Sequence, residues 1–280
     1  MRINFPVEET IRNRRSIRNY QNQIIDERTQ EAINAFLLTL TNPFDTKIHY
    51  YNLNINSKPS SQKLGTYDVI KGAQQYIGAA IPNTSQALYA LGYEFETLVL
   101  YLTHLGLGTC WLGGTFNRQA FSQAMEVSED QLFPIISPLG PPAEGLHFKE
   151  KAIRKLIKAD QRMAFGKLFF EQNFETPLSP QTANDLTFPL EMVRLGPSAS
   201  NKQPWRILKN KDGCHFYEAI EPGYSKAFSY DIQKIDLGIA AAHFDYAVQD
   251  QQINGHFDQN AAPNVALPPN YEYVFSWIQN

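Results

Sequence analysis

The stretch QALYALGYEFETLVLYLTHL at residues 86–105 is the most helix-like apolar segment of the chain. Its large apolar side chains recur at steps of three and four residues, which places them on one face of a helix. These residues are Leu88, Leu91, Phe95, Leu98, Leu102 and Leu105. Further Ala, Val and Leu residues lie on the other faces, so we expect a helix that is covered on most sides near the middle of the fold. Gly106 and Gly108 are expected to end it.

A second, weaker pattern of the same kind at 231–249 predicts a second central helix. The order of elements before the two central helices also repeats: a helix near 26–40 and a strand at 48–55, then a helix near 183–195 and strands at 205–210 and 214–220. We therefore predict an α+β fold, with a mixed, largely antiparallel sheet flanked by helices. Two pseudo-repeats, 1–155 and 156–280, are expected to form one compact unit through their central helices.

Composition limits the function. The chain has 280 residues, of which 43% are hydrophobic, and a net charge of −3, which argues against a nucleic-acid or anionic-membrane surface. Glu94, Glu96 and His104 make a membrane-spanning role costly for the first central helix. Two cysteines without CxxC spacing and six scattered histidines indicate a reduced interior and no metal site. Because no apolar stretch follows the first charges, a cytoplasmic location is expected.

The segment GPSASNKQPW at 196–205 is a rigid polar turn after an apolar helix. Gly196 and Pro197 stop the helix, and Pro204 is expected to hold Gln203 in an extended conformation. The turn offers backbone N–H groups and the side chains of Ser198, Asn201 and Gln203 to a ligand. An ordinary loop whose Ser and Asn satisfy their own backbone is the alternative.

The segment RRSIR at 14–18 offers three guanidinium groups and a hydroxyl, which suit phosphate oxygens. A solvated basic patch is the alternative for this segment taken alone. Together with the polar turn, it indicates a flat, polar, phosphorylated ligand, and we infer a flavin.

The segment GLGTCWLGG at 106–114 adds a glycine pair, Gly113 and Gly114, which lets the backbone approach a ligand plane closely. No Gly-Lys-Ser/Thr follows, so it is not a phosphate-binding P-loop, and its glycines end a helix rather than open one, unlike a dinucleotide fingerprint. Cys110 lies beside Trp111 and Leu112 without an obvious His partner, which favours a buried packing thiol over a nucleophile.

Taken together, these segments resemble the nitroreductase family of FMN-dependent flavoproteins over most of the chain. RRSIRNY is similar to the family's phosphate-binding signature, PSASNKQPW to its flavin-contacting loop, and GLGTCWLGG to the loop at the reactive edge of the ring. SPLGPPAE at 137–144 and KAIRK at 151–155 are similar to its C-terminal segment.

The resemblance implies the following FMN contacts. The phosphate and ribityl chain would be held by Arg14, Arg15, Ser16 and Arg18, with Arg154 and Lys155 completing the phosphate site. The ring would be lined by Pro197, Ser198, Ala199 and Asn201, with Gln203 nearby, and bordered by Leu112, Gly113 and Gly114 where hydride arrives. No catalytic side chain is implied, because the flavin carries the chemistry.

The order of the motifs differs from that of ordinary family members. In those proteins the PSxxNxQPW loop follows soon after the arginine signature, whereas here TLTNPFDTKIHYY occupies that place at 39–51. The second half has KADQRMAFGKLFF at 158–170 and AVQDQQINGHF at 247–257 in place of the other two motifs. The chain is therefore similar to a single-chain, internally duplicated subgroup, in which a fused homodimer has kept one of its two sites. One FMN per chain and a monomer that acts as a pseudo-dimer are expected.

The resemblance implies an NAD(P)H-dependent FMN oxidoreductase that reduces a small-molecule electron acceptor, a nitro compound or quinone, by ping-pong hydride transfer. A flavin enzyme of other chemistry on the same fold, such as a dehalogenase or an enoyl-type reductase, is an alternative, because fold does not determine function. A flavin-binding redox sensor is a further alternative. NADH and NADPH are equally open as donors.

Overall fold

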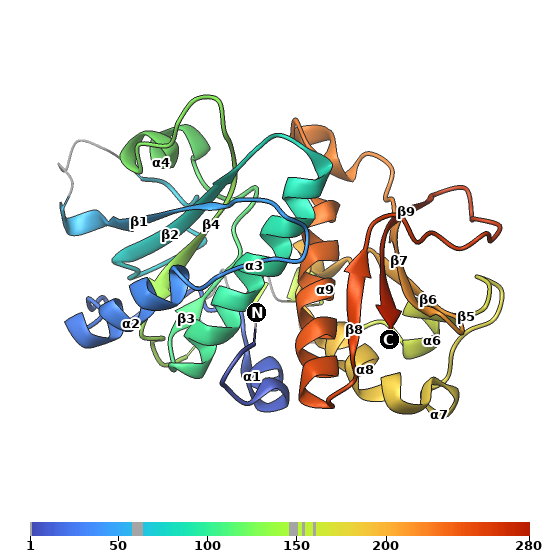
Figure 1. Ribbon diagram of the computed structural model, residues 1–280. Coiled ribbons are helices and arrows are strands. Elements are labelled where there is room, and N and C mark those ends of the chain that lie inside the picture. The colour runs from blue at the N-terminus through green and yellow to red at the C-terminus, as the bar shows by residue number, and fades with distance from the viewer. Residues whose placement is uncertain (1, 58–63, 146–150, 153–154, 159–160) are drawn as a thin grey trace.

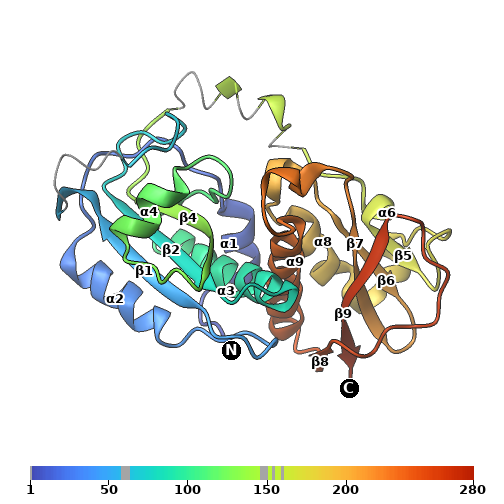
Figure 2. The same ribbon diagram turned by 90° about the horizontal axis from the view of Figure 1, so that it is seen from above.

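The computed structural model describes residues 2–57, 64–145, 151–152, 155–158 and 161–280. They form two units that lie side by side, each built around its own sheet (Figure 1). Seen from above, the long helices α3 (Ser85–His104) and α9 (Gln233–Asp250) lie next to each other between the two sheets (Figure 2). The two predicted central helices are therefore confirmed and form the junction of the molecule.

The remaining elements follow the chain in two series. The first unit contains α1 (Val7–Asn13), α2 (Glu27–Leu37), β1 (His49–Asn54), η1 (Ile55–Ser57), β2 (Gln75–Ile81), β3 (Gly108–Thr109), α4 (Arg118–Ala124) and β4 (Leu132–Gly140). The second unit contains α6 (Phe165–Leu168), β5 (Phe169–Glu171), α7 (Pro180–Ala183), η2 (Asn184–Leu186), α8 (Thr187–Leu195), η3 (Ala199–Asn201), β6 (Trp205–Lys209), β7 (Gly213–Ala219), η4 (Tyr224–Ala227), β8 (Gly255–Asp258) and β9 (Tyr271–Gln279).

The strands confirm the α+β class and form two sheets, one in each unit. The first sheet has the order β1-β2-β4-β3, and its pairs are antiparallel. The second has the order β5-β6-β7-β9-β8, and only β5 and β6 pair in parallel. Both sheets contribute buried apolar side chains to the core that surrounds the central helix pair.

Helix α3 begins and ends at residues suited to those positions. The side chain of Thr84 accepts a hydrogen bond from the backbone N–H of Ala87 at 3.2 Å. At the other end, Gly106 has φ +76°, and the N–H of Leu107 donates to the carbonyl of Leu102 at 2.9 Å, the arrangement of a Schellman motif. Gly106 thus ends the helix as predicted, whereas Gly108 lies in β3 rather than in the helix end.

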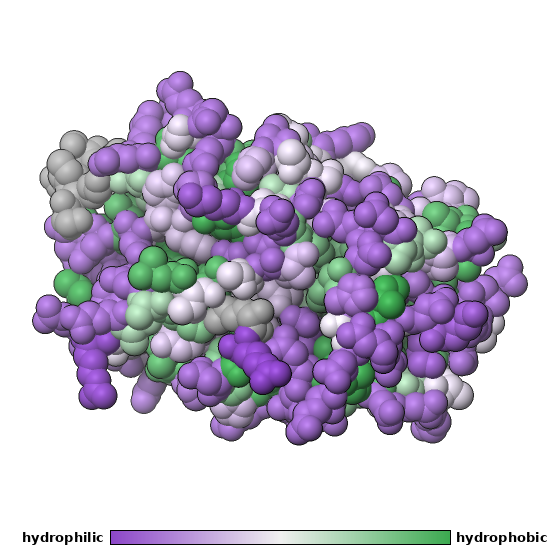
Figure 3. All heavy atoms as spheres, viewed as in Figure 1, coloured by the Kyte–Doolittle hydropathy of each residue, from purple (hydrophilic) through white to green (hydrophobic). Residues whose placement is uncertain are grey.

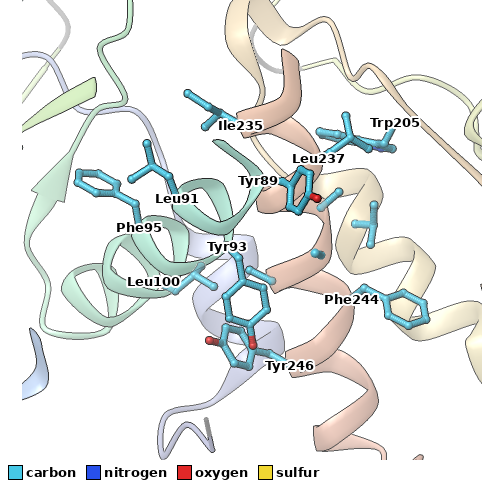
Figure 4. Packing of buried hydrophobic residues seen from close by; sticks show 14 of the residues in the cluster. Tyr89, Leu91, Tyr93, Phe95, Leu100, Trp205, Ile235, Leu237, Phe244 and Tyr246 are labelled. Carbon is cyan, nitrogen blue, oxygen red and sulfur yellow. The ribbon is translucent and has the colours of Figure 1, made fainter. Parts of the chain in front are cut away.

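The two central helices cross in close contact at a pair of glycines. A Cβ atom added to Gly92 would lie 2.0 Å from the carbonyl oxygen of Ile235, and one added to Gly238 would lie 1.9 Å from that of Tyr89. Only glycine therefore permits this approach of the two backbones. Beyond the crossing, Tyr93 and Tyr246 pack together, with ring centroids 5.8 Å apart (Figure 4).

The crossing relates the two helices symmetrically. Gly92 corresponds to Gly238 and Tyr89 to Ile235, and in both pairs the second number exceeds the first by 146. The same difference relates Trp111, after β3, to Phe257 in β8. These correspondences allow the same place to be compared in the two units.

The face of the molecule in Figure 3 is covered mainly by hydrophilic side chains, with apolar ones scattered between them. Cys110 and Cys214 are both buried, and Cys110 packs in an apolar cluster as expected. In the part of the chain that the structure describes, no helix is both long and apolar enough to span a membrane.

Candidate functional site

A cavity of about 130 Å³ lies where segments of both units meet at the first turns of α9. Its lining comprises Ser16, Arg18, Trp111, Gly113, Ile135, Ile157, Pro197, Ser198, Ala199, Ser200, Ile232, Ile235, Asp236 and Ile239. Three predicted segments, the arginine signature, the glycine loop and the PSASN turn, therefore border one cavity although they are far apart in the sequence. A larger groove of about 820 Å³, lined by Arg2, Asp245 and others, contains none of the predicted residues.

The arginine signature runs along the edge of the first sheet. Ser16 forms a parallel bridge with Thr109, and the N–H of Ile17 donates to the carbonyl of Thr109 at 2.8 Å. This pairing directs Ser16 and Arg18 into the cavity lining. Arg15 is exposed and donates to the backbone carbonyl of Arg14 at 2.9 Å, so its guanidinium lies outside the cavity lining.

The PSASN turn is shaped by residues in the left-handed region. Ser200, Asn201 and Gln203 have φ values of 49°, 56° and 48°. The expectation of an extended Gln203 is wrong, because hydrogen bonds hold it in this turn. Its N–H donates to Ser198 Oγ at 2.8 Å, and its side chain accepts from the N–H of Met163 at 2.7 Å. Ser198 and Ala199 are left facing the cavity.

Two predicted ligand residues of this turn instead hold neighbouring backbone. Gln203 is buried and also donates through Nε2 to the carbonyl of Arg194 at 2.9 Å. Asn201 donates through Nδ2 to the carbonyls of Lys158 and Gln161 at 2.9 and 3.0 Å. Neither residue lines the cavity, and the hydrogen bonds of both side chains support the turn.

In the glycine loop, Gly113 lines the cavity and Leu112 does not. A Cβ atom on Gly113 would lie 2.8 Å from Cδ1 of Ile232, so glycine keeps this wall open. Leu112 is buried in the apolar cluster of the first sheet, where its N–H donates to the carbonyl of Ile136 at 2.9 Å. Gly114 lies next to the ring of Phe228, outside the lining.

Trp111, which sequence reasoning did not assign to the ligand, forms a wall of the cavity and begins a buried polar chain. Its Nε1 donates to Glu96 Oε2 at 2.7 Å, and Glu96 Oε1 lies 2.9 Å from Nε2 of His243. Nδ1 of His243 lies 2.9 Å from the carbonyl oxygen of Met192, which can only accept, so Nδ1 carries a proton. A second proton must then lie between His243 and Glu96.

Arg14 belongs to the buried polar network of Trp111, Glu96 and His243 rather than to the cavity lining. It is buried, and its Nε lies 3.9 Å from Glu96 Oε1. The carboxyl of Glu96 thus receives the indole N–H and faces both a guanidinium and an imidazole. The arrangement holds Trp111 in one orientation, because leaving any of these buried groups without its partner costs free energy.

The segment KAIRK at 151–155, which resembles the C-terminal segment of the family, is only partly described. Arg154, expected to complete the phosphate site, lies outside the described residues. Lys155 is exposed and absent from the cavity lining, whereas Ile157 in the same segment lines it. The residues that sequence reasoning missed in the lining are Trp111, Ile135, Ile157, Ser200, Ile232, Ile235, Asp236 and Ile239. The α9 residues carried no signal of their own, since their apolar spacing predicts only a buried helix face.

The corresponding place in the other half of the molecule is filled by aromatic rings. Phe257 occupies the position in the second unit that Trp111 occupies in the first. Ile135 lies four residues before Leu139, which pairs with β3, and Phe275 lies four residues before Gln279, which pairs with β8, so Phe275 corresponds to Ile135. The buried ring of Phe44 packs against both, with centroids 5.7 Å from Phe257 and 5.0 Å from Phe275, whose own centroids are 5.5 Å apart.

Comparison with known proteins identifies relatives of the whole chain. A family model described as "Putative TM nitroreductase" matches residues 6–248. A crystal structure of a putative nitroreductase from Thermotoga maritima covers 99% of this chain and 95% of its own, with 21% identity and a TM-score of 0.62. No curated protein matches the chain.

Smaller structures match about half of the chain. An FMN-dependent nitroreductase from Clostridium difficile has 15% identity and a TM-score of 0.40, covering 49% of this chain and 88% of its own. A nitroreductase with bound FMN from Desulfitobacterium hafniense has 18% identity and a TM-score of 0.41, covering 54% of this chain and 97% of its own. Because the family model spans most of the residues and the whole-length structure shares the fold, the chain belongs to this nitroreductase family.

Proposed function

We propose that the chain is an FMN-dependent oxidoreductase whose flavin binds in the cavity at the first turns of α9. The observation that carries the proposal is the meeting of Ser16 and Arg18 of the first unit with Pro197, Ser198 and Ala199 of the second around one cavity. These segments belong to the motifs by which the sequence resembles the nitroreductase family.

The donor set of the cavity fits FMN. Arg18 and Ser16 supply a guanidinium and a hydroxyl, which suit phosphate oxygens. Ile232, Ile235 and Ile239 present an apolar strip from α9, which suits the face of a flat ring system and excludes water from it. Gly113 leaves space at the side wall for close approach of the backbone.

The size of the cavity adds a requirement. Its volume of about 130 Å³ is below the range of roughly 300–1,000 Å³ that is usual for small-molecule sites. Ile157 forms part of the wall. We therefore expect FMN binding to displace Ile157 and the turn Lys155–Lys158, while the walls formed by α9 and the PSASN turn stay in place.

The chemistry that FMN supplies when bound is the transfer of electrons from NADH or NADPH to a small-molecule acceptor, a nitro compound or quinone, in a ping-pong sequence. The residues of the chain bind and orient the ring. Arg18 and Ser16 would hold the phosphate, Trp111 would border the ring in the orientation that its hydrogen bond to Glu96 fixes, and the isoleucines at the start of α9 would exclude water. We assign no proton transfer to a side chain.

We further propose that residues 1–155 and 156–280 are two pseudo-repeats that form a fused pseudo-dimer with one FMN site. The symmetric crossing at Gly92 and Gly238 supports a duplicated pair of central helices. The aromatic filling around Phe44 supports the loss of one of two ancestral sites. A ratio of one FMN per chain and a monomer in solution are the expected results.

The test is a visible spectrum of the purified protein under anaerobic conditions, with the flavin released and quantified, before and after addition of NADH or NADPH. Bound FMN at one per chain that loses its colour rapidly supports the reductase. FMN that both nicotinamides leave oxidised would favour a redox sensor or a flavin enzyme with another donor. Absence of binding after reconstitution with FMN would refute the site, and two flavins per chain would refute the fused pseudo-dimer with one site.

A further inference from the structure

Asp236 is the carboxyl group in the lining of the candidate site, and no family motif of the sequence pointed to it. It lies in the first turns of α9 and is 3% exposed. Both of its oxygens lie near the backbone N–H of Ala199 in the PSASN turn, Oδ1 at 3.0 Å and Oδ2 at 3.2 Å. One N–H therefore serves two oxygens, which leaves hydrogen-bonding capacity on the carboxyl at the cavity wall.

The surroundings of Asp236 favour the neutral acid. Burial is the largest effect and raises its pKa well above the usual range, the N–H of Ala199 opposes this, and the neighbouring carboxyl groups of Glu218 on β7 and Asp231 before α9 raise the pKa further. The position near the helix N-terminus favours the anion, but by less than burial disfavours it.

The charged and titratable groups around Asp236 come from several elements. The carboxyl of Asp236 helps to raise the pKa of Tyr224 on η4, and Arg18 lines the same cavity. The nearest cation of α9, Lys234, is engaged elsewhere, because its Nζ lies 3.3 Å from Glu218 Oε2 and 2.9 Å from Glu272 Oε1. The ionic partners of Lys234 thus lie on the second sheet rather than in the cavity.

The carboxyl is confined to the half of the molecule that has the cavity. The position that corresponds to Asp236 across the helix crossing is Ala90, which is completely buried where aromatic rings fill the space. A buried carboxyl is costly unless something compensates it. The carboxyl is present beside the open cavity and absent from the corresponding place that Phe44, Phe257 and Phe275 fill, which points to a ligand as its partner.

We propose that Asp236 is a further ligand-binding residue, which meets the flavin ring as a neutral carboxylic acid and donates a hydrogen bond to an acceptor atom of the ring. One oxygen of the carboxyl keeps the bond from Ala199, and the hydroxyl of the acid points to the ring. This inference rests on the proposed function, because it requires FMN to bind in the cavity.

The first measurement is the dissociation constant of FMN for the full chain, from quenching of flavin fluorescence, at pH 7. Asp236→Asn keeps a neutral donor and an acceptor, so its dissociation constant is expected to stay within about threefold of the wild type. Asp236→Ala removes the donor and is expected to weaken binding about tenfold, as for one hydrogen bond. Asp245→Ala is the control, because Asp245 lies on the same helix, is half-buried and has a pKa that burial raises, but it lines the other groove, so it should leave binding unchanged.

The second measurement reports the protonation of Asp236 without flavin. A native carboxyl that stays protonated above the pH at which the unfolded carboxyl ionises makes folding less favourable as pH rises. The folding equilibrium constant of wild type relative to Asp236→Asn should therefore fall about tenfold from pH 5 to pH 6, as measured by urea unfolding of the flavin-free protein. A difference that is independent of pH in this range would overturn the neutral acid.

The outcomes separate this inference from the function beneath it. If wild type binds FMN and Asp236→Ala binds it equally well, the inference fails and the FMN site stands. If Asp236→Asn weakens binding as much as Asp236→Ala, the donor role fails as well. If wild type does not bind FMN at any pH from 6 to 9, the proposed function fails, and the contact with the ring fails with it.

Discussion

The crossing of α3 and α9 gives the sharpest prediction about the fold, which is tested by Gly238→Ala. The new Cβ atom would lie 1.9 Å from the carbonyl oxygen of Tyr89, 2.7 Å from the backbone nitrogen of Tyr93 and 2.8 Å from Cα of Gly92. Real Cβ contacts are essentially never shorter than 3.0 Å, so the helices must separate by about 1.1 Å. Because the contacting atoms are backbone atoms, no side-chain rotation can relieve the clash.

The change in the free energy of unfolding of Gly238→Ala follows from two opposing effects. Alanine is a better helix former than glycine by about 1 kcal/mol, which favours the variant. Overpacking of a core costs about 1–3 kcal/mol, and here the clash is with rigid backbone at the junction of the two units, so we expect at least about 3 kcal/mol of cost. The net loss should be about 2 kcal/mol or more, or about 4–8 °C in melting temperature for a chain of this size.

The assay is urea and thermal unfolding of Gly238→Ala followed by circular dichroism, with Gly65→Ala as the matched control. A Cβ atom on Gly65 would have no heavy atom within 4 Å, so its stability should change by less than about 0.5 kcal/mol. FMN binding should also weaken in Gly238→Ala, because Ile235 and Asp236 line the cavity from the same helix. Wild-type or higher stability of Gly238→Ala would refute the close crossing.

Three further predictions address the site, the filled place and the dependence of stability on pH. Arg18→Ala should weaken FMN binding about 10- to 100-fold in a fluorescence titration, the range for loss of a charged hydrogen bond, whereas Arg15→Ala should have little effect because Arg15 is exposed outside the lining. Phe44→Ala should cost about 3–5 kcal/mol in urea unfolding, and a loss below about 1 kcal/mol would contradict the tight aromatic packing around Phe44. Burial raises the pKa of Glu218 to about 8, so its contribution to stability is present below its unfolded pKa and is lost as pH rises toward 8. Glu218→Gln should therefore gain stability relative to wild type between pH 5 and 8, and an equal difference at both pH values would show that Glu218 is ionised throughout.

Much of the architecture could be predicted from local patterns. The spacing of Leu88, Leu91 and Phe95 predicted α3, and Gly106 supplied the left-handed residue that ends it. The segment IHYYNLNI at 48–55 contains β1, and WRILKN at 205–210 contains β6. These patterns predict structure well because the periods of helices and strands, and the residues that end a helix, depend on only a few neighbouring positions.

Details of the PSASN turn could not be predicted in the same way. The proline at 204 suggested an extended Gln203, but the residue has φ 48° because its hydrogen bonds to Ser198, Met163 and Arg194 outweigh the local preference. The same bonds turn Gln203 toward the protein interior. A polar residue in a motif can therefore support the loop rather than bind a ligand.

The sequence by itself determined the class of fold, the two central helices and the motifs of the nitroreductase family, because these depend on periodicity and on short segments. The tertiary structure decided which motif residues border one cavity, that Trp111 and Asp236 join them, and that Phe44, Phe257 and Phe275 fill the corresponding place. These features depend on contacts between residues that are far apart in the sequence. Their geometry is set by the close crossing of α3 and α9, which no local pattern encodes.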